Sequence, residues 1–289
     1  MSSNRERNDR KTGKKPPRKG GFEGPREGGW SPSGGRSRAP EPRPAGPRAK
    51  ADPDNFVWGR HPVLAALANP ARAGKGRLFA TPDRAAELER DGAAAGRDVE
   101  IVEGRELERM LPPGAAHQGL AFKVAPLEGV SLEELAEPAE GLLVMLDQLT
   151  DPQNVGAIFR SALAFGARGI IVQDRHSPAL AGALAKASAG AIERLPCARV
   201  VNLSRALERL ADAGWRAVGL DGSSDATLEQ ALDGAPTVLV MGSEGEGIRR
   251  LVAEHCDALA RIPMPGGFES LNVSNAAAIA LYEAARKRG

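Results

Sequence analysis

The stretch LLVMLDQLTDPQNVGAIFR, residues 142–160, decides the fold of the longer part of this chain. Its first five residues form an uninterrupted apolar run, which is typical of a parallel β-strand covered on both faces. A polar turn follows, and the apolar spacing then becomes that of a helix over residues 154–165. Asn154 stands where it can cap this helix. A buried strand that continues through a turn into a helix is the repeating unit of an α/β sheet.

Strand and helix patterns alternate on both sides of this unit. After residue 165 the sequence predicts strands at 169–173, 215–220, 237–241 and 258–262, and helices at 179–188, 202–213, 247–255 and 272–287. Before residue 126 the predicted strands are 77–80, 99–102 and 119–124, and the predicted helices are 61–68, 82–95 and 105–111. Residues 126–140 are rich in Pro, Gly and Glu and indicate a linker with one short helix. We therefore expect two α/β units, the second with right-handed crossovers.

The charge of the 289-residue chain is distributed unevenly. Residues 1–50 hold 14 Lys and Arg against 5 Asp and Glu, whereas residues 51–289 hold 25 against 32, a net charge of −7. The first 50 residues also contain 9 Gly and 8 Pro and few apolar side chains, so they are predicted to form a disordered basic tail. Two roles stay open for this tail: it solubilises the protein, or it tethers RNA through its phosphates.

Composition excludes several classes of protein. The only cysteines, Cys197 and Cys256, form no Cys-x-x-Cys pair, which excludes a disulfide framework and a zinc knuckle and predicts two small buried thiols. The histidines are too scattered to suggest a metal site, and we expect no metal. No apolar run approaches the roughly 20 residues of a membrane span, and the N-terminus lacks the apolar core of a signal peptide. We expect a cytoplasmic protein without a membrane partner.

Three stretches of the second unit follow apolar runs, where open α/β sheets bind their ligands. The first is the polar turn of residues 147–153, and Arg160 follows it within two helical turns with a guanidinium suited to phosphate. The second is GSEGEG at 242–247, whose three glycines allow a ligand to approach the backbone. It matches neither a P-loop nor the dinucleotide fingerprint.

The third stretch, RIPMPGGFESLNVSN at residues 261–275, leads from a predicted strand into the last helix. Four small polar side chains crowd the start of that helix, more than one cap requires: Ser270, Asn272, Ser274 and Asn275. Extra hydrogen-bonding groups at the positive end of a helix suggest a polar ligand. Each stretch alone also has an ordinary explanation, as a solvated arginine, a tight turn or a helix cap.

Together the three stretches resemble the three motifs of the SpoU (TrmH-like) branch of the SPOUT RNA 2′-O-methyltransferases. These motifs are Asn-x-Gly-x-x-x-Arg, Gly-x-Glu-Gly-x-Gly, and Ile-Pro-Met-x-Gly followed by Ser-Leu-Asn-Val-Ser, and they occur here in order within residues 142–287. Upstream, VWGRHPV at 57–63 and QGLA at 118–121 resemble the substrate-binding domain of the large-subunit (23S) rRNA guanosine members.

The resemblance implies an α/β fold: a C-terminal SPOUT domain with a deep trefoil knot around a parallel sheet, preceded by a small ribosomal-protein L30e-like domain. The implied divisions are a tail at 1–54, an RNA-binding domain at 55–126, a linker at 127–140 and a methyltransferase domain at 141–289. It also implies a homodimer that packs through the knot. The last helix carries small residues that permit close packing, namely Ala276, Ala277, Ala280 and Ala284.

The cofactor that the resemblance implies is S-adenosylmethionine, held bent and largely by backbone groups. The corresponding residues here are Gly242, Ile262 and Leu271, with Met241, Gly247 and Met264 nearby. Glycines and apolar residues suit an adenine slot without charged side chains.

A ribose 2′-hydroxyl is a poor nucleophile, so the reaction needs alignment and removal of its proton. The family assigns this work to the residue that is Arg160 here. Because a guanidinium stays charged in proteins, we favour a charge-assisted contact of Arg160 with the target phosphate or the developing alkoxide. Asn154 would position the loop and the ribose, and Glu244 would organise the glycine turn. Ser270 and Asn272 would orient the hydroxyl or the cofactor carboxylate.

The predicted function is therefore 2′-O-methylation of a guanosine in the P-loop region of 23S rRNA, or in a ribosomal precursor. A tRNA 2′-O-methyltransferase is the nearest alternative, and a non-catalytic RNA-binding protein and a nicotinamide-dependent dehydrogenase are more distant ones. Because residues 51–289 are net acidic, a local patch or the tail must contact phosphate. The candidates for that patch are Arg60, Arg72, Lys75, Arg77 and Arg160.

Overall fold

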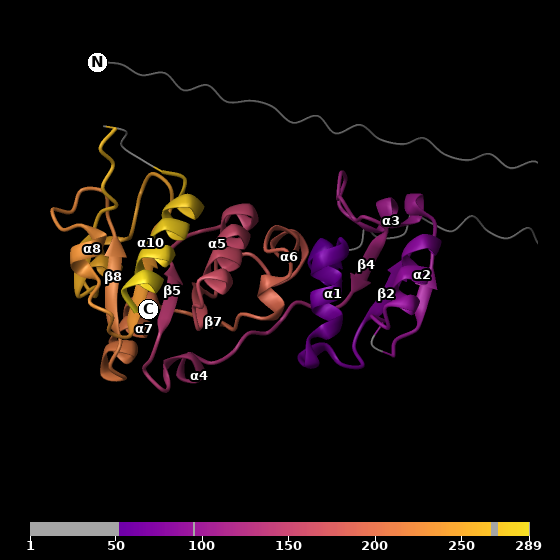
Figure 1. Cartoon of the computed structure of the whole chain (residues 1–289), viewed down its shortest axis with the longest axis horizontal. Helices are drawn as coiled ribbons and strands as arrows, with labels where there is room; N and C mark the ends of the chain where they lie inside the picture. The colour runs from indigo at the N-terminus through magenta and orange to yellow at the C-terminus, as the bar shows by residue number, and fades with distance from the viewer. Residues whose placement is uncertain (1–51, 95, 267–270, 289) are drawn as a thin grey trace, which may run out of the picture. The chain divides into compact units, whose positions relative to one another are not determined.

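The computed structural model describes residues 52–94, 96–266 and 271–288, and these contain two β-sheets (Figure 1). The strands are β1 Phe56–Trp58, β2 Arg77–Ala80, β3 Val99–Ile101, β4 Leu120–Lys123, β5 Leu142–Leu146, β6 Gly169–Gln173, β7 Cys197–Val200, β8 Arg216–Leu220, β9 Thr237–Met241 and β10 Ala258–Ala260. The helices are α1 Arg60–Ala68, α2 Pro82–Arg90, α3 Gly104–Met110, α4 Leu132–Ala136, α5 Pro152–Ala164, α6 Gly182–Ala187, α7 Leu203–Asp212, α8 Leu228–Ala231, α9 Arg250–Ala253 and α10 Val273–Arg288. Short 3-10 turns are η1 Pro53–Asn55, η2 Pro70–Arg72 and η3 Ala191–Glu193. The tail expected at 1–54 lies, except for its last three residues, outside the described part.

The larger sheet is parallel throughout, as the sequence predicts. Its strand order is β10-β8-β9-β5-β6-β7, and every neighbouring pair is parallel. The side chains of Leu142, Val144 and Leu146 pack in one apolar cluster with α5, α6 and α10. Leu143 and Met145 pack in a second cluster, on the opposite face, with α4, α7 and α9. Helices thus cover both faces, which explains the uninterrupted apolar run of β5.

The smaller sheet, formed by the upstream unit, has the order β1-β4-β2-β3. Strand β4 pairs antiparallel with β1 and β2, and β2 pairs parallel with β3. One face shares an apolar cluster with the α5 side of the larger sheet, through Val57, Leu78 and Phe122. The other face is closed by α3, whose Leu107 is fully buried among Phe56, Trp58 and Phe79. The shared cluster ties the two sheets together.

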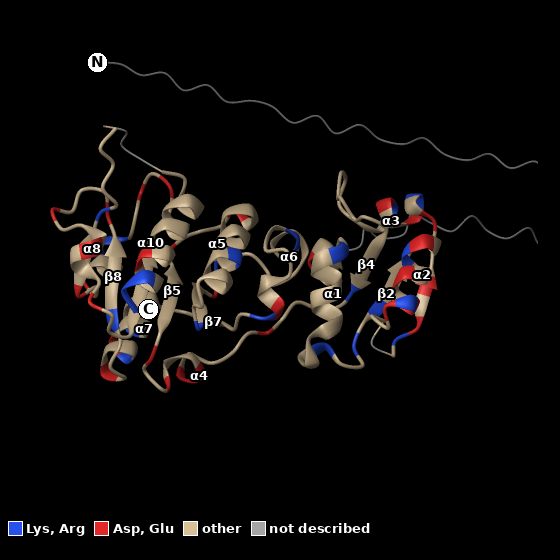
Figure 2. Cartoon of the chain, in the orientation of Figure 1, with Lys and Arg blue, Asp and Glu red and all other residues tan. Residues whose placement is uncertain are grey.

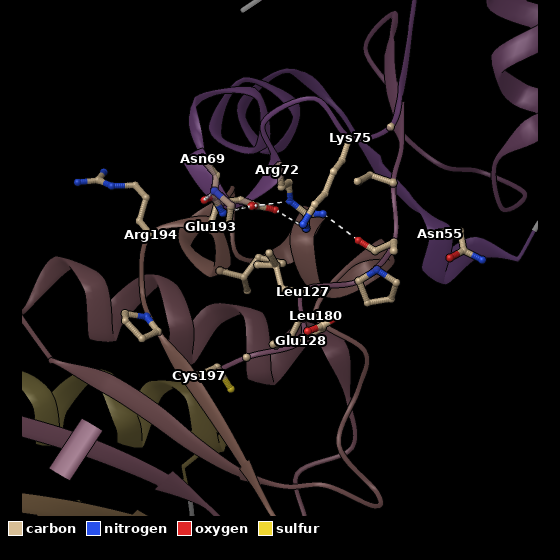
Figure 3. A pocket seen from close by; sticks show the side chains of 18 of the residues that line it. Asn55, Asn69, Arg72, Lys75, Leu127, Glu128, Leu180, Glu193, Arg194 and Cys197 are labelled. Carbon is tan, nitrogen blue, oxygen red and sulfur yellow. Dashed lines mark hydrogen bonds and ion pairs between the residues drawn. The ribbon is translucent and has the colours of Figure 1, made fainter. Parts of the chain in front are cut away.

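A buried ion pair reinforces that junction (Figure 3). Arg72, 2% exposed, donates from Nε and Nη2 to the two carboxylate oxygens of Glu193 at 2.8 and 2.9 Å. Its Nη1 donates to the carbonyl oxygen of Ala125 at 2.8 Å, and Asn69 Nδ2 donates to Glu193 at 2.8 Å. All these contacts link the smaller sheet's unit to η3 of the larger one or to the segment between them. The expectation that Arg72 contacts RNA is therefore wrong, because its guanidinium is buried and paired.

Two strands were not predicted. Strand β7 is the last strand of its sheet. It pairs with β6 on one side and has an isolated bridge from Val130 to Ala198 on the other. It therefore needs no long apolar run, and the charged Arg199 interrupts its pattern. Strand β1 has three residues and pairs only with β4. One predicted element is also much shorter than expected, because the helix expected at 247–255 is reduced to α9. Its start is delayed by Gly247, whose φ is 68°, and by Arg249, whose backbone is extended.

Residues 126–140 contain the one short helix that was predicted, α4, which begins with a capping box between Ser131 and Glu134. Leu132 and Leu135 are buried in the cluster below β5, so α4 packs as part of the larger unit. No helix in the described part of the chain is long and apolar enough to span a membrane.

The alanines of the last helix do not form its exposed face. Ala277, Ala280 and Ala284 are at most 3% exposed and belong to the cluster that includes α5. The exposed apolar side chains of α10 are instead Ile279 and Tyr282. The small residues thus allow α10 to approach its own chain, and they are not free to pack against a second one.

Candidate active site

The three motif stretches meet at the edge of the larger sheet where β5, β9 and β10 end. Helix α5 begins here with Asp151, whose carboxylate accepts from the backbone N–H groups of Gln153 and Asn154 at 3.0 and 3.3 Å. The prediction that Asn154 caps this helix is therefore wrong. Asp151 occupies the cap position because Pro152 supplies the first helical residue. The amide of Asn154 remains available for other contacts.

One residue from each motif joins a hydrogen-bonded cluster, which we call the three-motif cluster: Asn154, Glu244 and Asn272. Asn272 Nδ2 donates to Glu244 Oε1 at 2.7 Å and to Asn154 Oδ1 at 3.0 Å. Asn154 Nδ2 approaches the same Glu244 oxygen at 3.4 Å, and the backbone N–H of Val273 donates to it at 3.2 Å. Glu244 thus accepts three donor contacts at the start of α10, and its carboxylate orders all three stretches at once.

Asn272 has a second task at the same position. Its Oδ1 accepts from Ser274 Oγ at 2.6 Å and from the backbone N–H groups of Ser274 and Asn275 at 3.0 and 3.4 Å. Its amide therefore caps α10 with one end and joins the cluster with the other. Capping accounts for part of the polar crowding seen in the sequence. Ser270 lies outside the described residues.

The glycine turn between β9 and α9 folds back on itself. Ser243 and Gly247 exchange two backbone hydrogen bonds of 3.1 and 3.0 Å, and Gly245 and Gly247 have φ values of 91° and 68°. A Cβ at Gly242 would lie 1.9 Å from the carbonyl carbon of Gly247. Gly242 is therefore required for the turn to close.

Gly242→Ala is expected to lower the free energy of unfolding by about 1–3 kcal/mol, because the turn must open to admit the new methyl group. Gly222→Ala is the matched control: it also follows a strand at this edge, and a Cβ there meets no atom within 4 Å. We expect the control to change stability by less than about 0.5 kcal/mol. Urea denaturation measures both, and equal midpoints would contradict this account of the turn.

An ion pair between a buried carboxylate and a half-buried guanidinium lies beneath the glycine turn and was not predicted from the sequence. Asp147, fully buried directly after β5, accepts from the backbone N–H of Arg249 at 2.9 Å and from its guanidinium at 2.6 and 2.8 Å. The backbone N–H of Asp147 donates to the carbonyl of Met241 at 2.8 Å. The signal was present in the sequence: an Asp follows the most apolar strand, and an Arg follows the glycines. Their pairing joins the first two motifs below the three-motif cluster.

The residues expected at the cofactor fall into two groups. The backbone groups of Gly242 and Ile262 make no backbone hydrogen bond to another described residue, and Gly247 and Leu271 are exposed. Free backbone donors and acceptors beside exposed apolar surface suit a ligand that is held by the main chain. Met241, by contrast, is 1% exposed, and its carbonyl oxygen accepts from the backbone N–H of Asp147, so its side chain packs in the apolar core next to the glycine turn. Met264 is half-buried.

Arg160 stands apart from the three-motif cluster. It lies six residues further along α5 than Asn154 and is exposed, and its side chain makes no ion pair or hydrogen bond within the described residues. An exposed cation without an internal partner is available to a substrate anion.

The thiols are not nucleophiles at neutral pH. Burial raises the pKa of both Cys197 and Cys256 to about 12, and the carboxylates of Asp257 and Asp147 add to the rise at Cys256. Across the described ranges, no group of His, Cys, Asp and Glu could hold a metal ion.

A cavity of about 790 Å³ lies elsewhere, at the start of β7 and beside the Arg72–Glu193 pair (Figure 3). None of the residues that the sequence analysis assigned to catalysis or to the cofactor lines it. The amino ends of parallel strands lie opposite the carboxyl ends, so this cavity is separate from the three-motif cluster.

Comparison with known proteins agrees with this geometry. The model of the "SpoU rRNA Methylase family" matches residues 141–282, and a model described as "RNA 2'-O ribose methyltransferase substrate binding" matches residues 56–130. A protein of Mycolicibacterium smegmatis named as an uncharacterized tRNA/rRNA methyltransferase is 43% identical over 247 residues, which are 83% of this chain and 78% of that one. This chain belongs to the SpoU rRNA methylase family.

Solved structures of SpoU methyltransferases share the fold. The SpoU methyltransferase AviRb of Streptomyces viridochromogenes, crystallised with the cofactor AdoMet, matches with a TM-score of 0.67 and 29% identity, over 81% of this chain and 89% of that one. An AdoMet-bound rRNA methyltransferase from Sinorhizobium meliloti matches with a TM-score of 0.66 and 27% identity, over 80% and 86% of the two chains. The SpoU assignment agrees with a parallel sheet whose three motif stretches meet at one edge.

Proposed function

We propose that this SpoU protein transfers a methyl group from S-adenosylmethionine to the ribose 2′-hydroxyl of a guanosine in large-subunit rRNA. The observation that carries the proposal is the three-motif cluster, in which one residue of each family motif takes part in a single hydrogen-bonded network. Residues 56–130, which match the RNA 2′-O ribose substrate-binding model, supply a second unit for RNA.

S-adenosylmethionine is the methyl donor, and it supplies an electrophilic methyl group on a sulfonium when bound. The residues present suit it. The backbone groups of Gly242 and Ile262, which make no backbone hydrogen bond within the described part of the chain, would hold its polar edges, and Leu271 would cover its apolar face. Gly247 and Met264 lie on the same two stretches and complete the site. The two AdoMet-bound relatives support the same assignment.

On the RNA side, the chain's own residues position the nucleophile. Arg160 binds the target phosphate, which aligns the ribose, or it binds the developing alkoxide, whose charge its guanidinium stabilises in the transition state. The three-motif cluster keeps Asn154 and Asn272 in place beside the ribose, with Glu244 as their common acceptor. Ser270 completes the set in the proposal, from the stretch that leads to Asn272.

Three features of the family complete the proposal. We divide the chain at 54, 126 and 140 into tail, RNA-binding domain of the L30e type, linker and methyltransferase domain, and the two sheets support these boundaries. A trefoil knot is proposed on the family resemblance, and the position of β9 between β8 and β5 and the packing of α10 on α5 agree with it. A homodimer is supported by Ile279 and Tyr282, 42% and 56% exposed on α10, and a monomeric mass in analytical ultracentrifugation would contradict it.

The proposal is tested by methyl transfer from labelled S-adenosylmethionine to unmodified 23S rRNA and to unmodified bulk tRNA, side by side, with the labelled nucleotide mapped. We expect the label in rRNA as 2′-O-methylguanosine, and we expect Arg160→Ala to lose it. Label only in tRNA would keep the reaction and overturn the substrate. The relatives are named tRNA/rRNA methyltransferases, which makes the tRNA arm a necessary comparison. Label in neither RNA, nor in ribosomal precursor particles, would overturn the proposed reaction.

A further inference from the structure

The junction between the two sheets carries a local excess of positive charge. Helices α1, α6 and α5 contain one basic residue each, namely Arg60, Lys186 and Arg160, and none of the three contains an acidic residue. The three helices lie in a row in Figure 1, and Figure 2 shows a blue segment on each. Because residues 51–289 are net acidic, this row is an exception to the charge of the folded part.

Lys186 occupies the centre of this junction and was not singled out from the sequence. Its ammonium lies over Gly59, so close that a Cβ at Gly59 would be 2.5 Å from Nζ. Its hydrogen-bond partner is Gln118 Oε1 at 3.4 Å, and no carboxylate of the described residues lies within 4.0 Å of Nζ. Partial burial without a counter-ion lowers the pKa of Lys186. A bound anion would supply the missing countercharge.

The partner of Lys186 is held rigidly. Gln118 has a φ of 55°, and its Oε1 also accepts from the backbone N–H of Arg60 at 3.0 Å. Its carbonyl oxygen accepts from Arg84 Nε at 3.1 Å. Gly119 follows with a φ of 81°, and a Cβ there would lie 2.6 Å from Thr81 Oγ1. The loop therefore presents Arg60, Arg84 and Lys186 in a defined arrangement.

Two of these three cations, Arg60 and Arg84, share a single carboxylate. Glu87 pairs with Arg60 at 2.9 Å and also with Arg84. The hydrogen bonds from Arg84 and Arg60 lower the pKa of Glu87, so it is ionised at neutral pH. Asp54, on η1, lies beside Gly182 at the start of α6. With both carboxylates counted, one positive charge remains in excess among these groups. An anionic polymer fits such a surface better than a neutral ligand does.

The row of cations continues toward the three-motif cluster. Gly156 of α5 packs against α6 so tightly that a Cβ there would lie 2.4 Å from Ala187 Cβ. Residues four apart share one face of a helix, so Arg160 leaves α5 on the side that faces α6 and Lys186. Asn154 lies at the beginning of the same helix, about 9 Å from Arg160 along the axis at 1.5 Å per residue.

We propose that Lys186, with Arg60 and Arg84 beside it, binds a backbone phosphate of the RNA next to the nucleotide that is methylated. The inference rests on the proposed function and deepens it, because it names a contact that would hold the RNA strand between the smaller sheet's unit and Arg160. Lys186 is then a substrate-positioning residue, which binds the RNA backbone and does not contact the cofactor.

The test compares equilibrium binding of unmodified 23S rRNA over a range of salt concentrations. Lys186→Met keeps most of the side-chain stem and removes the charge. We expect it to weaken binding about tenfold at low salt and to reduce the slope of log affinity against log salt by about one phosphate contact. Lys186→Arg keeps the charge and is expected to retain the RNA affinity and the salt slope of the wild type. The affinity for S-adenosylmethionine is expected to be unchanged in both variants.

Lys287→Met is the matched control, because Lys287 lies at the end of α10 and reaches Glu229 at 3.9 Å. It is expected to bind RNA like the wild type. The inference is overturned if Lys186→Met, folded as judged by its melting temperature, keeps wild-type affinity and salt slope. If the wild type methylates no RNA, the proposed function fails instead, and the two failures are distinct because one is read from binding and the other from product.

Discussion

Replacing Glu193 with Gln is expected to lower the free energy of unfolding by about 3–5 kcal/mol, the cost of leaving one charge of a buried ion pair unpaired. The guanidinium of Arg72 is 2% exposed and uses three nitrogens, toward Glu193 and the carbonyl of Ala125. In the Glu193→Gln variant, a neutral amide replaces the carboxylate that accepts from Arg72. Because the site is buried, water does not take the place of that carboxylate. Chemical denaturation measures the change.

The matched control is an exposed pair of the same chemistry. Arg77 and Glu100 are 2.6 Å apart, with side chains 65% and 47% exposed, and Glu100→Gln is expected to cost no more than about 1 kcal/mol. The double variant Arg72→Met with Glu193→Met is expected to be more stable than either single variant, because it leaves no unpaired charge. If Glu193→Gln costs no more than the exposed control, the pair does not hold the two units together.

Arg160→Ala is expected to reduce kcat about 10²- to 10³-fold, the usual loss when one preorganised donor to a developing negative charge is removed. The affinity for S-adenosylmethionine should not change, because the Arg160 side chain is exposed and makes no hydrogen bond to the described residues of the stretches that the cofactor is proposed to use. Single-turnover methyl transfer, with the cofactor affinity measured by calorimetry, separates the two effects.

Arg205→Ala is the matched control for Arg160→Ala. Arg205 is exposed on α7, and its side chain makes no ion pair within the described part of the chain. We expect this variant to retain wild-type kcat. Equal losses in the two variants would point to a general effect of charge on RNA binding, and an active Arg160→Ala would exclude the assigned role.

Much of the fold follows from local patterns. The apolar run of β5 is uninterrupted because both faces of the strand are covered, and its helix begins after a polar turn as predicted. The elements that sequence analysis missed or overextended are those whose stability is not local. Strand β7 exists because β6 offers an edge to pair with. Helix α9 begins late because Asp147 holds the backbone of Arg249 in an extended conformation.

The assignment of individual side chains was harder to predict than the elements. Asn is a residue type that often caps helices, yet Asp151 and not Asn154 caps α5. Only the hydrogen bonds of the structure distinguish the two residues. Arg72 looked like a surface cation, and its partner Glu193 lies 121 residues away. The sequence does not indicate whether a charged residue is buried, so a buried ion pair and a solvated ion pair cannot be distinguished from the sequence.

By itself, the sequence determined the class of fold, the order of the elements and the stretches that carry the chemistry, because apolar periodicity and short motifs are local properties. Tertiary structure alone decided which of those side chains meet. Glu244 joins Asn154 across 90 residues and Asn272 across 28, and Lys186 reaches Gln118 across 68. Such contacts depend on strand order in the sheet and on the close approach of helices at glycines, and both are set by the packing of the whole chain.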